Sequence, residues 1–205
     1  MKEVDVERVR AETRGCKELI HFNNAGASLM PAPVADYLCN FLREEEMRGG
    51  YETRSLRNVD IESFYKSVSL LLNAKPKEIA FVENATRAWD MVFYALPLGP
   101  GDKILTTVSE YGSNLIAYLH RAKQTGAEIV IVPNDKNGQI DINALEQNID
   151  EKTKLISISH IPTGGGLINP AHDVGRIAKK YGIPFLLDAC QSVGQMHLDV
   201  NAIGC

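Results

Sequence analysis

Residues 185–191 read F-L-L-D-A-C-Q, and this stretch decides the fold. The apolar run Ile183–Leu187 lies between Gly182 and Asp188, which is typical of a buried strand in a parallel sheet. A carboxylate at the end of such a strand is costly unless it meets a cation or several hydrogen-bond donors. Because open parallel sheets bind ligands at this edge, we expect Asp188 to face a positive charge there.

The rest of the chain alternates strand and helix patterns around this run. Apolar runs predict five strands, at Glu78–Val82, Lys103–Val108, Ala127–Val132, Leu155–Ser159 and Pro184–Leu187. Helical patterns cover residues 1–20, Pro33–Met47, Asp60–Asn73, Arg87–Leu96, a segment ending at Thr125, Asp141–Asp150 and Ala171–Tyr181. This order predicts an α/β fold, a three-layer sandwich with a mostly parallel sheet and an N-terminal helical segment. We divide the chain into a helical segment with a small-residue loop, residues 1–75, and a sheet domain, residues 76–205.

The composition is that of an ordinary globular protein. The 205 residues are 44% hydrophobic and 23% charged with a net charge of −4, so we expect no nucleic-acid partner. No apolar run approaches the roughly 18 residues of a membrane span, and residues 1–20 lack the apolar centre of a secretory leader. We therefore expect a cytoplasmic protein without a membrane partner. The four cysteines and five histidines form no metal-binding motif, so we expect no metal.

Four loops that follow predicted strands carry polar or glycine residues, and a parallel sheet brings them to one edge as a candidate site. They contain Asn84-Ala85-Thr86, Glu110–Asn114, His160–Gly166 and Asp188–Gln191. In the first loop, backbone N–H groups and the Thr86 hydroxyl at a helix N-terminus suit an anion. Simple N-capping by Thr86 explains that loop equally well. The three glycines 164–166 match neither the phosphate-loop motif nor the dinucleotide fingerprint.

Asp188 and Gln191 form the most specific pair. An acid at a strand end keeps a pyridinium nitrogen protonated through a charge-assisted hydrogen bond, and a glutamine three residues later suits a phenolate oxygen. Together with the anion site, these residues predict contacts to a phosphorylated pyridine. The alternative is that Asp188 caps the following turn. We interpret His160 as a strand-end hydrogen-bonding residue and Cys190 as a buried thiol rather than a nucleophile.

From about His21 to Cys205 the chain resembles the class V aminotransferase family of fold-type I pyridoxal-phosphate enzymes, which includes cysteine desulfurases and isopenicillin N epimerase-like proteins. The stretches that carry the resemblance are S-H-I-P-T-G-G-G-L-I-N-P-A (159–171), I-P-F-L-L-D-A-C-Q-S-V-G-Q-M (183–196), L-D-V-N-A-I-G-C (198–205), F-V-E-N-A-T-R-A (81–88) and G-D-K-I-L-T-T-V-S-E-Y-G-S-N (101–114). The resemblance implies pyridoxal 5'-phosphate as cofactor. It implies that residues 76–205 are part of the cofactor-binding large domain.

The same resemblance implies roles for individual residues. Asp188 would pair with the pyridine nitrogen and Gln191 would contact the ring hydroxyl oxygen. Ala85 and Thr86 would bind the phosphate through the backbone and the hydroxyl. A second set of implied positions comprises His160 and Thr163 beside the ring, Tyr111 stacked on it, and Asn24 and Ala25 near the substrate.

Two departures from the family pattern shape the expected function. Tyr111 stands where cysteine desulfurase relatives stack a histidine on the ring. The family's Schiff-base lysine lies beyond Cys205, so the chain is expected to be the N-terminal portion of a longer homodimeric enzyme. The implied reaction is transamination, C–S cleavage or epimerisation of an amino acid or amine. The alternative is a non-catalytic module that binds a phosphorylated ligand or a partner chain.

Overall fold

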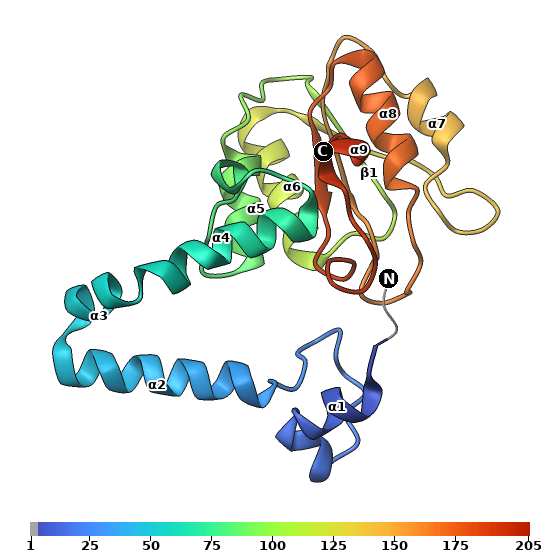
Figure 1. Ribbon diagram of the computed structural model, residues 1–205. Helices are drawn as coiled ribbons and strands as arrows, with labels where there is room; N and C mark the ends of the chain where they lie inside the picture. The colour runs from blue at the N-terminus through green and yellow to red at the C-terminus, as the bar shows by residue number, and fades with distance from the viewer. Residues whose placement is uncertain (1–3) are drawn as a thin grey trace. The chain divides into compact units, whose positions relative to one another are not determined.

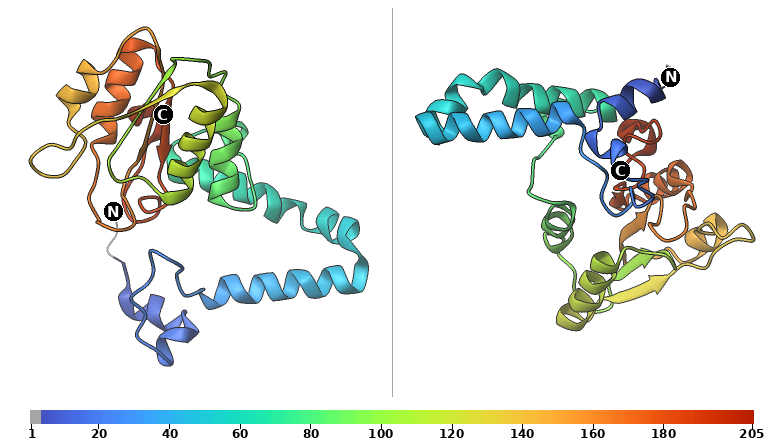
Figure 2. Two further views of the ribbon diagram at one scale, coloured as in Figure 1. Left: turned by 180° about the vertical axis from the view of Figure 1, so that it is seen from behind. Right: turned by 90° about the horizontal axis from the view of Figure 1, so that it is seen from below.

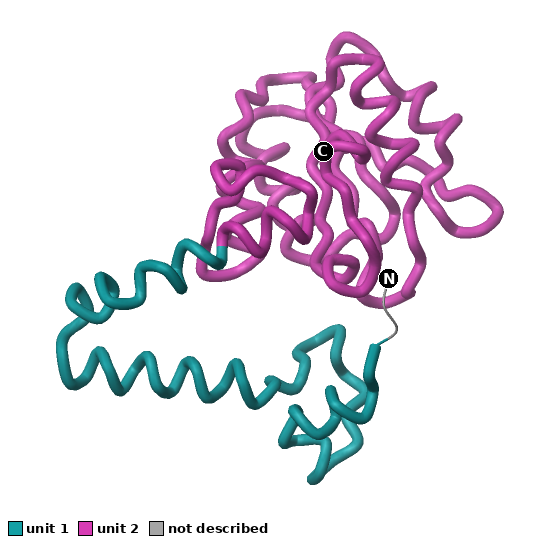
Figure 3. The backbone as a smooth tube through the Cα atoms, viewed as in Figure 1, with its two compact units in different colours: residues 1–64 teal, residues 65–205 magenta. Residues whose placement is uncertain are grey.

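The computed structural model describes residues 4–205. The chain divides into two compact units, the first ending at Phe64 and the second comprising Tyr65–Cys205 (Figure 3). The division falls within one helix, and we describe each unit by itself.

The first unit is helical. Its elements are α1 (Val6–Ala11), η1 (Arg14–Lys17), α2 (Ala32–Arg48), α3 (Gly50–Leu56) and the start of α4 (Asn58–Leu72). The predicted single helix over residues 1–20 is wrong, because Thr13 is extended and separates α1 from the short 3-10 turn η1. Gly49, with φ of 89°, ends α2 and begins α3, a helix that the sequence patterns did not predict.

The second unit contains a parallel four-stranded sheet in the order β2-β1-β3-β4. The strands are β1 (Lys103–Thr106), β2 (Glu128–Ile131), β3 (Thr153–Ser159) and β4 (Phe185–Asp188). Each corresponds to a predicted strand, and β3 lies between β1 and β4. The helices of this unit are α5 (Ala85–Tyr94), α6 (Gly112–Thr125), α7 (Ile142–Gln147), α8 (Ala171–Tyr181) and α9 (Val200–Ile203), together with the 3-10 turn η2 (Pro76–Glu78).

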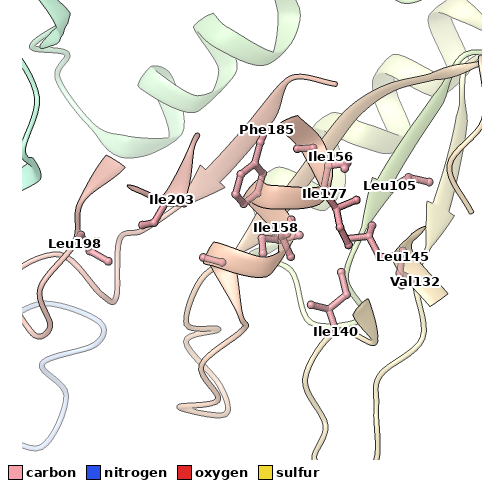
Figure 4. Packing of buried hydrophobic residues seen from close by; sticks show 13 residues of the cluster. Leu105, Val132, Ile140, Leu145, Ile156, Ile158, Ile177, Phe185, Leu198 and Ile203 are labelled. Carbon is pink, nitrogen blue, oxygen red and sulfur yellow. The ribbon is translucent and has the colours of Figure 1, made fainter. Parts of the chain in front are cut away.

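Side chains alternate between two hydrophobic clusters, as the pleat of a strand requires. On β1, Ile104 packs into a cluster with Trp89 and Phe93 of α5, whereas Leu105 packs into the cluster that includes α8 and α9. Figures 1 and 2 show α5 and α6 on one side of the sheet and α7 and α8 on the other. Figure 4 shows the second cluster, in which Ile203 lies near the end of the chain and Phe185 on β4. The predicted three-layer α/β arrangement is confirmed.

The predicted strand at Glu78–Val82 is wrong. Residues 76–78 form η2, and residues 79–82 run without strand pairing to any of the four described strands. A strand needs a hydrogen-bonded neighbour, and local apolar pattern alone does not supply one.

Candidate functional site

The candidate site lies in the second unit, at the edge where the parallel strands end. β1 ends at Thr106, β3 at Ser159 and β4 at Asp188, so the loops that follow leave the sheet on the same side. The main-chain N–H of His160 donates to the carbonyl of Asp188 (2.8 Å), which joins the residue after β3 to the last residue of β4. This edge is where doubly wound sheets bind ligands.

Asp188 is partly buried, and both of its carboxylate oxygens accept hydrogen bonds. Oδ2 accepts from the side-chain amide of Asn114 (2.9 Å), and Oδ1 accepts from the backbone N–H of Cys190 (3.1 Å). The second contact confirms that Asp188 caps the following turn. None of the ion pairs between described residues involves Asp188. The carboxylate is therefore oriented by two neutral donors, and no described lysine, arginine or histidine pairs with it.

In the loop before α5, the helix is capped by Asn84 and not by the Thr86 hydroxyl. Asn84 is the N-cap, because its side chain accepts from the backbone N–H of Arg87 (2.8 Å), and the interpretation of Thr86 as the capping residue is wrong. The Thr86 hydroxyl instead lies 3.4 Å from the Ser113 hydroxyl in the first turn of α6. Two helix N-termini and two hydroxyls thus meet at one place, which suits an anion.

A cavity of about 360 Å³ opens between the loops that follow β1 and β3. Its lining includes Tyr111, Gly112 and Thr163, so two of the predicted cofactor residues share one cavity. Tyr111 is 52% exposed and is free of the hydrophobic core. An aromatic ring at the mouth of a cavity is placed to stack on a flat ligand.

Glu110 ties this cavity to β3. Its carboxylate accepts from the Thr107 hydroxyl, from the backbone N–H of Ser159 (2.9 Å) and from the Ser159 hydroxyl (3.0 Å). Burial raises the pKa of Glu110 above its ordinary value, and the nearby charge of Asp188 adds to this, although the hydrogen bonds oppose it. The sequence patterns placed Glu110 in this candidate loop but gave it no role; in the structure it attaches the loop that carries Tyr111 to β3.

His160 directly follows β3, and Gln191 lies in the loop that follows Asp188 at the end of β4. His160 is 4% exposed, and its Nδ1 is 3.0 Å from the Ser192 hydroxyl. Burial, with a smaller contribution from His172, lowers the pKa of His160. These contacts agree with a strand-end hydrogen-bonding residue. Gln191 is partly buried, and its main-chain carbonyl accepts from the side chain of Gln195 (2.8 Å).

Cys190 is exposed, so the expectation of a buried thiol is wrong. Although the residue as a whole is exposed, partial burial of its sulfur raises the pKa of Cys190 to about 12, and a hydrogen bond to Asp188 and the charge of that carboxylate add to this. A thiol with this pKa is protonated at neutral pH and is a poor nucleophile.

Asn24 and Ala25 belong to the first unit, where they form a turn with Gly26. The main-chain N–H groups of Gly26 and Ala27 donate to the carbonyl of Asn23, and the His21 ring contacts the carbonyl of Ala27 (2.8 Å). Their expected position near a substrate stays a prediction.

Residues 4–205 contain no group of three or more histidine, cysteine, aspartate or glutamate side chains arranged to hold a metal ion. Across the same residues, no helix has the length and apolar character that crossing a membrane requires.

Comparison with known proteins now gives the family. The model of the aminotransferase class-V family matches residues 20–205. The chain belongs to the class V aminotransferase family. A protein of Synechocystis sp. described as a probable cysteine desulfurase is 34% identical over 195 residues, covering 91% of this chain and 46% of the relative.

Solved structures of related proteins have the same fold as this class V aminotransferase chain. The apo structure of a cysteine desulfurase from Thermococcus onnurineus NA1 has a TM-score of 0.88 and 28% identity, covering 100% of this chain and 52% of the other. A variant of the protein C-DES, with glycine covalently linked to its pyridoxal-phosphate cofactor, has a TM-score of 0.86 and 20% identity, covering 95% and 52% of the two chains. The chain spans about half the length of these relatives.

Proposed function

We propose that this chain supplies the ring and phosphate contacts of a pyridoxal 5'-phosphate site in an enzyme that cleaves the C–S bond of an amino acid such as cysteine. The observation that carries the proposal is Asp188, a partly buried carboxylate that neutral donors orient at the end of β4 without an ion pair to any described residue. The names of the relatives favour C–S cleavage over the other reactions of the family.

The residues at the sheet edge fit this cofactor in chemical type. Asp188 would accept the hydrogen bond of a protonated pyridine nitrogen, and Gln191 would donate to the ring hydroxyl oxygen. Ala85 and Thr86, at the start of α5, would bind the phosphate through backbone N–H groups and the hydroxyl. The hydroxyl at Thr86 is available for this role because Asn84 already caps the helix.

The remaining predicted residues would enclose the ring. Thr163 and Tyr111 line the same cavity of about 360 Å³, and His160 is hydrogen-bonded to the main chain of Asp188 and to Ser192. When bound, pyridoxal phosphate supplies an electron sink for the amino-acid substrate. Asp188, next to the ring nitrogen, would favour its protonated form and so would strengthen that property.

Tyr111 distinguishes this site from that of cysteine desulfurases with a histidine in the same place. A tyrosine supplies an aromatic face for stacking, but it does not exchange a proton near neutral pH as an imidazole does. We therefore propose that Tyr111 orients the cofactor and that another group moves the substrate proton. Asn24 and Ala25 would lie on the substrate side, and we propose a homodimer, as the family resemblance implies.

The test is a titration with pyridoxal phosphate of the protein as its gene encodes it, followed by absorbance and equilibrium dialysis. Asp188→Ala should weaken binding at least about 10-fold, since it removes a charge-assisted hydrogen bond. Asp173→Ala is the matched control, because Asp173 is an exposed acid in α8 that pairs with Arg176. Equal affinity of the two variants would refute the role of Asp188.

The products formed from an amino-acid substrate distinguish the possible reactions. With cysteine as substrate, release of sulfide supports C–S cleavage, whereas transfer of the amino group to a 2-oxo acid supports transamination instead. Cofactor binding without turnover of any amino acid would favour the non-catalytic alternative. Absence of any affinity for pyridoxal phosphate in the wild-type protein would overturn the proposal as a whole.

A further inference from the structure

The side chain of Asn114, on α6, contacts Asp188 at the end of β4. It lies in the first turn of α6, is 2% exposed, and donates from Nδ2 to Oδ2 of Asp188 at 2.9 Å. The two residues are 74 positions apart in the sequence. The connection is therefore a product of the tertiary fold and not of a local turn.

β1 leads into α6, and β4 carries Asp188. Because β3 lies between these two strands, the Asn114 side chain has to extend across β3 to reach Asp188. Two serines make this possible. Ser159 pairs in register with Asp188, and Ser157 pairs with Leu186. Both serines have the same parity along β3, so their small side chains occupy the face opposite the isoleucines at 156 and 158.

A second hydrogen bond shows which face of α6 covers these serines. Tyr118, one helical turn after Asn114, donates its hydroxyl to Ser157 Oγ at 2.8 Å and is fully buried. Residues four apart lie on the same side of a helix. Tyr118 therefore lies on the face of α6 that packs on β3, and Asn114 lies on the same face.

Asn114 and the N–H of Cys190 hold different oxygens of the carboxylate, so together they fix the rotation of the Asp188 group. An amide donor stabilises a carboxylate without neutralising it, whereas a lysine or arginine at the same place would compete with a cationic ligand. The choice of asparagine suits a carboxylate that has to pair with an incoming cation.

We propose that Asn114 is a positioning residue for the cofactor site, one that orients the Asp188 carboxylate toward the ring nitrogen of pyridoxal phosphate. The inference rests on the proposed function. It adds a residue to which the resemblance assigned no role, and it assigns the effect to the second hydrogen bond on Asp188 and not to any contact between Asn114 and the cofactor.

The experiment measures pyridoxal-phosphate affinity and the pH dependence of the absorbance of bound cofactor, in the protein as its gene encodes it. Asn114→Ala should weaken binding about 10-fold and shift the pH at which the bound ring nitrogen loses its proton to lower values. Asn114→Asp, which is of equal size but places a carboxylate against Asp188, should weaken binding further. Tyr118→Phe is the matched control, since it removes a buried hydrogen bond from the same helix face without touching Asp188.

Under the proposal, Tyr118→Phe keeps its affinity within about 2-fold and leaves the pH profile unchanged. If Asn114→Ala and Tyr118→Phe behave alike, Asn114 is a packing residue only and the inference is wrong. A double variant, Asn114→Ala with Asp188→Asn, should bind no more weakly than Asp188→Asn alone, and additive losses would also refute the inference. Failure of the proposed function looks different, because the wild-type protein itself would then show no bound-cofactor spectrum.

Discussion

The packing of α8 against α9 gives the sharpest prediction about stability. Gly175 lies in the middle of α8 and is buried. A Cβ atom at this position would be 1.7 Å from the carbonyl oxygen of Ile203 and 2.9 Å from its carbonyl carbon. Since these are backbone atoms, rotation of a side chain does not relieve the overlap. Gly175→Ala therefore forces α9 away from α8.

The expected size of the effect follows from what α9 buries. Ile203 is 2% exposed and Leu198, just before the helix, is 5% exposed. Full burial of each side chain is worth about 1.5–3 kcal/mol. Alanine in place of glycine favours a helix by about 1 kcal/mol, which opposes the loss. We expect Gly175→Ala to lower the free energy of unfolding by about 2–5 kcal/mol.

Urea unfolding followed by circular dichroism and by the fluorescence of Trp89, the single tryptophan, measures this loss. Gly165→Ala is the control, because its Cβ atom meets nothing within 4 Å and its φ is not positive. Hydrogen exchange should show faster exchange at residues 200–204 in Gly175→Ala only. If the two variants unfold at the same urea concentration, or if these amides stay protected, the steric reasoning is refuted.

Three polar side chains near the sheet edge give further expectations. Because partial burial of the sulfur and the neighbouring Asp188 raise the pKa of Cys190 to about 12, Asp188→Asn should speed alkylation of Cys190 by iodoacetamide at pH 8 at least about 3-fold, as measured by peptide mass mapping; an unchanged rate contradicts this. Burial raises the pKa of Glu110 above 4.5, so folded Glu110 binds its proton more tightly than unfolded Glu110, and its contribution to stability falls as pH rises through this range. Glu110→Gln should therefore lower the urea midpoint less at pH 8 than at pH 5, and equal losses would oppose the argument. Asn84→Ala should lower the free energy of unfolding by about 1 kcal/mol through the lost cap of α5, whereas Asn84→Ser should restore most of it; equal losses would show that the cap is not the cause.

Much of the second unit could be predicted from sequence because its strands are short apolar runs bounded by glycine, proline and polar residues. The run that ends at Asp188 was correctly placed, and so was the helix Ala171–Tyr181. The segment Glu78–Val82 has an equally apolar pattern, yet it pairs with none of the described strands. The apolar pattern of a segment shows only that the segment favours burial. A strand also needs a neighbouring strand to pair with, and the rest of the fold decides whether one is present.

The candidate site divides in the same way. The position of Asp188 at a ligand-binding edge follows from the order of strands and helices, which the sequence displays. Asn114 has no local signal, because a neutral amide in the first turn of a helix is common on protein surfaces. Its partner depends on β3 lying between β1 and β4, and the strand order is visible only in the structure. The stretch E-Y-G-S-N, residues 110–114, indicates a loop at the site but gives no sign of the hydrogen bond between Asn114 and Asp188.

Strand β3 connects the stability of the domain to the geometry of the site. Its sequence alternates isoleucine at 156 and 158 with serine at 157 and 159. The isoleucines are fully buried in the cluster with α8, so they fix the position of the strand. The serines on the opposite face receive Tyr118 and Glu110, and they leave room for the Asn114 side chain to reach Asp188. A larger residue at 159 would break the bond to Glu110 and obstruct that path, so the small side chains of β3 are as necessary to the site as the acid itself.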